Sequence, residues 1–280
     1  MKPMRMTITL VLGLFCFCAT HANGASKPIQ LFNGKNLSGW TTWLKTSQHT
    51  DPQSVFTVAD HSIRISGEGY GYLATNDEFE NYRLKLEFRW GKQSHTDRGE
   101  RKGTALDSGV FLHATGPHGN SHDGDGAYMA AIECNVYQGA TGDFLLIRGD
   151  DREGHLIVPR ATVSQASFTD SDGFPFWQPG GQKRELHTFG RINWSKKSLE
   201  WKDQRDFRGS NDLERPYGNW NRLVCECRDR SISTWLNGTL INQVSDVYPY
   251  KGKILLQCEG AEIYYRNITL TPLASTKTPK

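Results

Sequence analysis

The run Ala130–Gln138 carries a carboxylate inside an otherwise apolar strand pattern. Strand alternation puts Glu133, Asn135 and Tyr137 on one face and apolar residues on the other. A carboxylate in such a run is costly unless it faces a polar cavity, where it can transfer protons as an acid or base. We therefore expect one face to pack in the core and the other to line a polar cleft. An ordinary solvent-facing row is the alternative.

A second strand-like run, residues 108–113, precedes a glycine-rich loop that leads to the first run. Alternation puts Gly109, Phe111 and His113 on one of its faces. His113 is the second candidate acid or base, because an imidazole can donate or accept a proton near neutral pH. The alternative is a histidine packed near the end of the sheet.

Alternation with period two dominates the elements that must position these residues. Residues 82–90 alternate apolar with charged side chains and predict a half-buried strand. Asn237 and Gly238 separate two strand-like runs and predict a hairpin, since both turn positions need positive φ. No helical run longer than about two turns stands out. Many short strands in one chain favour an all-β antiparallel sandwich.

The N-terminus has the pattern of a secretory signal peptide. Lys2 and Arg5 precede the uncharged apolar stretch 8–19, and small residues follow at 22–25. The stretch is too short to span a bilayer, which takes about 20 apolar residues. We expect residues 1–24 to be removed and the protein to be exported, to a periplasm or the medium. A single domain is expected over residues 28–273, with a frayed tail over residues 274–280.

Charge excludes some classes of partner. The formal net charge is +3, and removal of Lys2 and Arg5 brings it near +1. No long block of like charge is present, so we expect neither nucleic acid nor membrane insertion. Two long irregular regions, residues 91–106 and 149–215, are expected to carry loops. Free thiols are preferred for the four cysteines after the signal peptide, and one cross-strand disulfide is the alternative.

Several short motifs occur in a recognisable order. They are Leu31–Trp40, Asp107–His113, the Glu133 strand, Gly218–Asn221, Trp235–Gly238, and Leu256–Gly260 followed by Arg266–Ile268. Together they resemble the 3-keto-disaccharide hydrolase family over nearly the whole mature chain. The resemblance implies a concanavalin-like jelly roll, the fold of legume lectins and laminarinase-type glucanases, with long loops over the concave sheet.

Characterised members of that family act on glycosides already oxidised to a ketone at C3, so the resemblance implies a 3-keto glycoside as substrate. A laminarinase-like enzyme would need a second carboxylate about 5–5.5 Å from the first, and here Asn135 and Tyr137 follow Glu133 on the strand. Many relatives have Glu-x-Gln where this chain has Glu-Cys-Asn. Ordinary retaining hydrolysis is therefore disfavoured.

One general base suffices for a 3-keto glycoside, because the ketone acidifies the proton at C2 and the aglycone at C1 can leave by elimination. Water then adds to the unsaturated product. We expect Glu133 to act as the acid/base group, with a structural carboxylate paired to an arginine as the alternative, and His113 to assist it or to stabilise the enolate. The residues expected to bind the sugar are Asn135, Trp177, Trp201, Asp203, Arg205, Gln257 and Glu259.

Alternatives to these assignments remain. Trp177 could only anchor its loop, and Trp201, Asp203 and Arg205 could belong to a salt-bridged surface loop. A non-catalytic carbohydrate-binding module and a laminarinase-like hydrolase are the alternative functions. The loop 118–126 holds Asp and His, but its spacing matches no established metal-binding loop. We expect neither a metal nor another cofactor.

Overall fold

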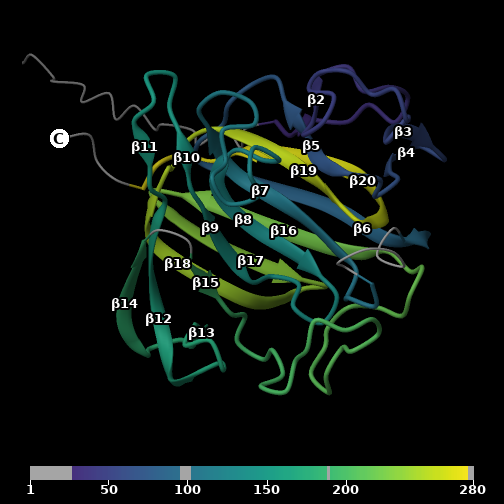
Figure 1. The fold of residues 1–280 in the computed structure, drawn as a ribbon. Coiled ribbons are helices and arrows are strands. Elements are labelled where there is room, and N and C mark those ends of the chain that lie inside the picture. Colours follow the sequence, from purple (N-terminus) through teal and green to yellow (C-terminus); the bar gives the residue numbers. More distant parts are fainter. Residues whose placement is uncertain (1–26, 95–101, 188–189, 277–280) are drawn as a thin grey trace, which may run out of the picture.

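The computed structural model describes residues 27–94, 102–187 and 190–276. The expected signal peptide lies outside these residues. The described residues form strands connected by turns and loops (Figure 1). The strands are β1 (Ile29–Gln30), β2 (Trp40–Leu44), β3 (Phe56–Ala59), β4 (Ser62–Ile65), β5 (Tyr70–Thr75), β6 (Tyr82–Ser94), β7 (Asp107–Thr115), β8 (Ala130–Tyr137), β9 (Phe144–Ile147), β10 (Gly149–Asp150), β11 (Leu156–Ile157), β12 (Arg160–Thr169), β13 (Pro175–Trp177), β14 (Gln182–His187), β15 (Arg191–Ile192), β16 (Asn221–Arg228), β17 (Ser231–Leu236), β18 (Thr239–Tyr248), β19 (Lys253–Glu259) and β20 (Ala261–Pro272).

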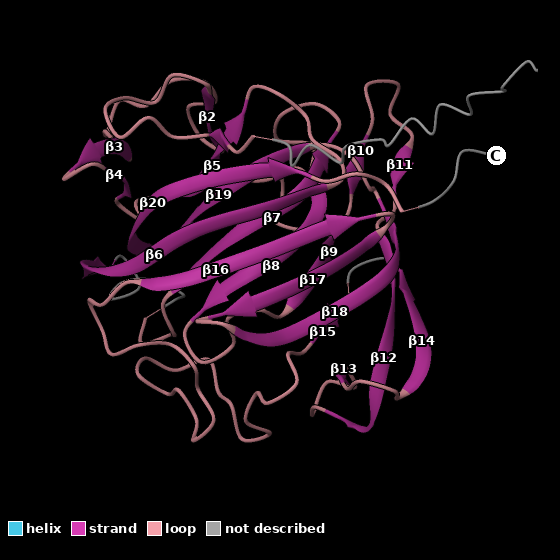
Figure 2. Ribbon diagram, turned by 180° about the vertical axis from the view of Figure 1, so that it is seen from behind, coloured by secondary structure: helices cyan, strands magenta, loops and turns pink. Residues whose placement is uncertain are grey.

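Two antiparallel sheets are stacked face to face (Figures 1 and 2). The larger sheet has the order β13-β12-β18-β17-β16-β6-β20-β4-β3, with β14 beside β12 and β1 beside β20. The smaller has the order β15-β9-β8-β7-β19-β5-β2. The main hydrophobic core fills the space between them and includes Leu86 and Phe88 of β6 and Ile132 and Val136 of β8. The expected all-β antiparallel sandwich of the concanavalin-like type is confirmed.

Local sequence explains the central elements. In β6 the apolar residues are buried and the charged residues between them face outward, as the alternation predicts. The β17–β18 hairpin turns at Asn237 and Gly238, whose φ values are 50° and 91°, as a two-residue hairpin turn requires. The four cysteines in the described part of the chain are free and buried. No helix formed by the described residues is long and apolar enough to cross a membrane.

The region expected to be irregular, residues 149–215, is more ordered than its composition suggests. β12 pairs with both β14 and β18 and widens the larger sheet, because Ala161 and Val163 reach the core between polar residues. The stretch between β15 and β16 is the true long loop (Figure 1). Of the tail expected to fray, Ser275 and Thr276 donate hydrogen bonds to Asp229, and residues 277–280 lie outside the described residues.

Candidate active site

A polar cavity lies on the face of the seven-stranded sheet that points away from the core. Its volume is about 410 Å³. Strands β7, β8, β15 and β19 supply side chains from the sheet, and loops complete the rim. The polar side chains that line it are Asp107, Asp123, Tyr128, Glu133, Asn135, Tyr137, Arg191, Asp203, Gln257 and Glu259. The polar row predicted on β8 therefore faces a cavity.

Glu133 lies in the floor of this cavity and is 4% exposed. Phe111 is its partner on β7, and Gly109, the partner of Asn135, lies diagonally across from it. A Cβ added at Gly109 would be 2.2 Å from a Glu133 carboxylate oxygen. The glycine thus leaves the space that the carboxylate occupies. Within the described residues the carboxylate receives no hydrogen bond. Burial raises the pKa of Glu133 well above its ordinary value, the charges of Asp107 and Glu259 raise it further, and Arg191 lowers it.

Glu259 is held by donors instead. The Tyr128 hydroxyl donates to its carboxylate at 2.6 Å and the Gln257 amide nitrogen at 2.7 Å. Burial raises the pKa of Tyr128 well above its ordinary value, and the charge of Glu259 adds to this effect, so the phenol stays protonated and can donate. Glu259 is therefore suited to accept hydrogen bonds, and Glu133 to exchange a proton.

Two amide oxygens beside Glu133 have no hydrogen-bond partner in the part of the chain that the structure describes. The side-chain oxygens of Asn135 and Gln257 are buried and have no hydrogen-bond partner among the described residues. Such groups are rare in folded proteins because an unpaired buried acceptor is costly. Both residues line the cavity, so hydroxyl groups of a bound ligand could supply the missing donors.

Arg191 contributes a positive charge to the cavity, and a buried carboxylate holds its side chain in place. Asp143, whose side chain is completely buried, accepts hydrogen bonds from Arg191 at 3.3 Å, from Lys197 at 2.8 Å and from the backbone of Trp194 at 2.8 Å. β15 brings Arg191 beside β9 at the edge of the sheet. A guanidinium fixed in this way can bind a ligand oxygen that becomes negative during a reaction.

The expectation that His113 faces the cavity with Glu133 is wrong. Two residues of β7, His113 and Ala114, oppose one residue of β8, so the register shifts. His113 has φ of 58° and turns away from the cavity to pack edge-on against Tyr82 of the other sheet, while Ala114 packs on the outward side. Burial lowers the pKa of His113 to about 4, and its Nδ1 is 3.1 Å from the Pro249 carbonyl oxygen.

The two expected tryptophans have different surroundings. Trp177 is buried in the core between the sheets, so the prediction that it stacks on a sugar is wrong and it anchors its loop. Trp201 packs edge-on against Tyr137 and donates to the Gln138 carbonyl at 3.0 Å. It lines a second cavity of about 410 Å³ that shares Tyr137, Arg191 and Asp203 with the first. Trp201 is thus adjacent to the site.

Asp203 and Arg205 come from the long loop between β15 and β16. Asp203 lines the cavity and accepts a hydrogen bond from the Ala105 backbone at 2.9 Å. Arg205 is not among the residues that line it, and its Nε donates to the Thr104 carbonyl at 3.3 Å. The structure therefore gathers Glu133, Asn135, Asp203, Gln257 and Glu259, while Arg205 joins the loop to the segment before β7.

Sequence reasoning missed Asp107, Tyr128 and Arg191. Asp107 begins the β7 run, two residues before Gly109 on the same face, so alternation could have found it. Tyr128 lies in a loop and Arg191 in a strand of two residues. No sequence signal places either beside Glu133.

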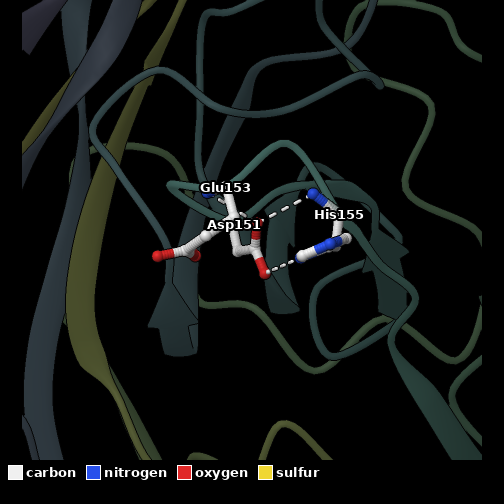
Figure 3. A group of neighbouring side chains, drawn as sticks. All are labelled: Asp151, Glu153 and His155. Carbon is white, nitrogen blue, oxygen red and sulfur yellow. Dashed lines mark hydrogen bonds and ion pairs between the residues drawn. The ribbon is translucent and has the colours of Figure 1, made fainter.

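Acidic groups of the loops near the cavity have local partners. Asp123 forms a bidentate ion pair with Arg148, and Asp125 pairs with Lys45 at 3.0 Å. At the tip of the β10–β11 hairpin, Asp151, Glu153 and His155 lie close together, with the imidazole turned toward the Asp151 carboxylate (Figure 3). Asp151 also accepts two backbone hydrogen bonds there. These bonds explain the cluster as a turn.

Comparison with known proteins gives one family match. Residues 27–271 match the family described as the 3-keto-alpha-glucoside-1,2-lyase-like domain. No curated protein matches.

Several solved structures are similar in part. A Parabacteroides distasonis protein assigned provisionally as a glycosyl hydrolase has 17% identity, with 88% of this chain and 94% of that chain covered and a TM-score of 0.49. A carbohydrate-binding module from Bacillus subtilis has 10% identity, coverage of 83% and 95% and a TM-score of 0.44. The β-glucanase of Bacillus licheniformis has 9% identity, coverage of 90% and 100% and a TM-score of 0.42.

Proposed function

This chain belongs to the family of the 3-keto-alpha-glucoside-1,2-lyase-like domain, and we propose that it cleaves 3-keto glycosides at the cavity around Glu133. The observation that carries the proposal is the state of Glu133: a buried carboxylate in a polar cavity, without hydrogen bonds from the described residues. Burial raises the pKa of this carboxyl, and a carboxylate with a raised pKa is a stronger base that can take a proton and return it.

The proposed reaction has two steps. Glu133 removes the proton from C2, the electron pair forms the C1–C2 double bond, and the C1–O bond to the aglycone breaks. The proton now on Glu133 passes to the leaving oxygen, which is attached to the neighbouring carbon. Water then adds its hydroxyl to C1 and a proton to C2, so the sum is hydrolysis of the glycosidic bond.

Arg191 supports the first step by its charge. Loss of the C2 proton places negative charge on the C3 oxygen, and a fixed cation stabilises such an oxyanion. Arg191 lines the same cavity and is held by Asp143. The free oxygens of Asn135 and Gln257 accept hydrogen bonds from sugar hydroxyls, and Glu259 accepts others. In this scheme His113 has no part, because it packs on the other side of the sheet.

The test compares matched 3-keto and unmodified glucosides of the same aglycone. Only the 3-keto compound should release aglycone, and Glu133→Gln should lower kcat/KM by at least about 100-fold, the size of a general-base contribution. Glu185→Gln on exposed β14 is the matched control and should keep full activity. Turnover of the unmodified glucoside, or full activity of Glu133→Gln, would contradict the proposal.

Isotope labelling separates elimination from direct hydrolysis. In heavy water, elimination followed by hydration places one deuterium at C2 of the sugar product. Direct displacement at C1 leaves C2 unlabelled when the product is sampled before free exchange. An unlabelled product would therefore keep the substrate assignment and overturn the mechanism.

We also propose that the protein is exported, because residues 1–24 have the pattern of a signal peptide. Expression of the full chain should give a mature protein that begins between residues 22 and 26, recovered outside the cytoplasm. An intact N-terminus by mass spectrometry would contradict this proposal.

A further inference from the structure

The back of the larger sheet, opposite the active cavity, carries a row of cations. On β6 the outward residues are Arg83, Lys85, Glu87 and Arg89, and on β16 they are Arg222, Val224, Glu226 and Arg228. β20 adds Arg266. These strands are neighbours in the order β16-β6-β20 (Figure 2). Charges that are scattered along the sequence therefore meet on one face.

The strand register places these charged residues side by side on the sheet. Arg222 and Arg266 flank Glu87 on either side, and Arg266 Nε donates to it at 2.8 Å. One carboxylate thus lies between two guanidinium groups. Glu226 pairs with Arg83 and with Arg228. Lys85 and Arg215, which comes from the neighbouring loop, line hollows on this face and form no ion pair with a carboxylate of the described residues. The face is therefore positive although the whole chain is nearly neutral.

Two adjoining hollows form a groove on this face. Their volumes are about 450 and 620 Å³, and Arg222 and Gly238 line both. We call this the back-face groove and define it by Arg83, Lys85, Arg215, Arg222, Trp235 and Arg266. The two hollows together offer more room than a single small ion needs.

Aromatic side chains lie among the cations. Trp220 lines one hollow, with the Arg266 guanidinium carbon 3.9 Å from its ring centroid. Trp235 lines the other and is half-buried beside Val224, its cross-strand neighbour. A tryptophan face can pack on the apolar face of a sugar ring, and guanidinium groups bind carboxylate or sulfate in a bidentate manner.

We propose that the back-face groove binds an anionic polysaccharide, one that carries carboxylate or sulfate groups. Charge complementarity favours an acidic chain, and Trp235 with Thr269 and Thr271 in the same hollow favours a carbohydrate over other polyanions. The sandwich core separates the groove from the Glu133 cavity, so both can be occupied together. The groove would hold the protein on an acidic glycan while the cavity acts on a separate small substrate.

Binding is measured by titration calorimetry on the mature protein at two salt concentrations. Polygalacturonate supplies carboxylates, dextran sulfate supplies sulfates, and neutral dextran is the control. At least one acidic polymer should bind, more weakly at high salt, and neutral dextran should not. Arg222→Ala/Arg266→Ala should weaken binding at least tenfold without a change in turnover of a 3-keto glucoside. Arg152→Ala/Lys183→Ala, which removes two exposed charges elsewhere, should bind normally.

Three further arms complete the test. Arg222→Lys/Arg266→Lys keeps both positive charges but removes the planar guanidinium groups that bind an anion in a bidentate manner. This variant should bind more weakly than the native protein and more tightly than the double alanine variant. Trp235→Ala should weaken the acidic polysaccharides more than inorganic polyphosphate. Duplex DNA and vesicles containing phosphatidylglycerol should bind less tightly than the better polysaccharide. Absence of binding to both acidic polymers, equal binding by the double alanine variant, or tighter binding to DNA or vesicles would overturn the proposal.

Discussion

A methyl group at position 109 would occupy space that the Glu133 carboxylate fills. The added carbon would be 2.2 Å from a carboxylate oxygen of Glu133 and 2.9 Å from the amide oxygen of Gln257. Ordinary contact begins at 3.4 Å, so in Gly109→Ala the carboxylate has to move by about 1.2 Å. A displacement of about 1 Å from the reacting geometry costs roughly 100-fold in rate. We expect kcat/KM of Gly109→Ala on a 3-keto glucoside to fall by about that factor.

The backbone itself permits this substitution. Gly109 is not among the residues with positive φ, and alanine would lower the entropy of the unfolded chain, which is worth about 0.4–1 kcal/mol. This gain offsets part of the cost of displacing the carboxylate, which is about 1–3 kcal/mol, so the melting temperature should fall only slightly while activity falls. Val110→Ala, on the core face of the same strand, is the control and should show the reverse: lower stability with activity retained. Full activity of Gly109→Ala would refute the role assigned to the position of Glu133.

Three further predictions follow from buried side chains. His113→Asn should keep kcat/KM within about threefold, since the imidazole lies outside the cavity. The substitution should lower the free energy of unfolding by about 1–3 kcal/mol. A loss of activity of about 100-fold would instead indicate that His113 takes part in catalysis. Burial raises the pKa of Glu214 to about 7, so the folded state favours the protonated carboxyl. The contribution of Glu214 to the free energy of unfolding should therefore fall as the pH rises from 4.5 to 7, by at most about 3 kcal/mol. Urea unfolding at several pH values should show this fall in the free energy of unfolding for the native protein but not for Glu214→Gln. The same pH dependence in both proteins would contradict the prediction. Trp177→Ala should lower the free energy of unfolding by about 3–5 kcal/mol, and the substrate KM of the folded fraction should stay unchanged; a raised KM would indicate contact with the sugar.

The fold could be predicted because its strands alternate strictly. In β6 and β8 every second side chain enters the core, and this pattern can be seen without any knowledge of partners. β12 was missed because it lies toward the end of its sheet and carries serine, threonine and glutamine between few apolar residues. A strand with so little core contact has no clear sequence signal.

The site was only partly predictable because register and distant contacts decide it. Glu133, Asn135 and Gln257 could be placed from alternation. His113 could not, since one extra residue in β7 reverses its direction, and a bulge leaves no mark in the pattern. Arg191 reaches the cavity through a two-residue strand beside β9. From the sequence alone, the cations of the back face look like the usual solvent-exposed residues of separate strands. Only the order of the strands shows that they lie together.

Every residue of β8 is buried, from Ala130 to Tyr137. One side of this strand supports the sandwich and the other forms the floor of the cavity, so no position is free to vary without effect. An exchange at Cys134 or Val136 that alters volume will shift the backbone and with it Glu133 and Asn135. New substrate preferences should therefore arise more easily in the loop between β15 and β16, which can be rebuilt while the reacting carboxylate keeps its place.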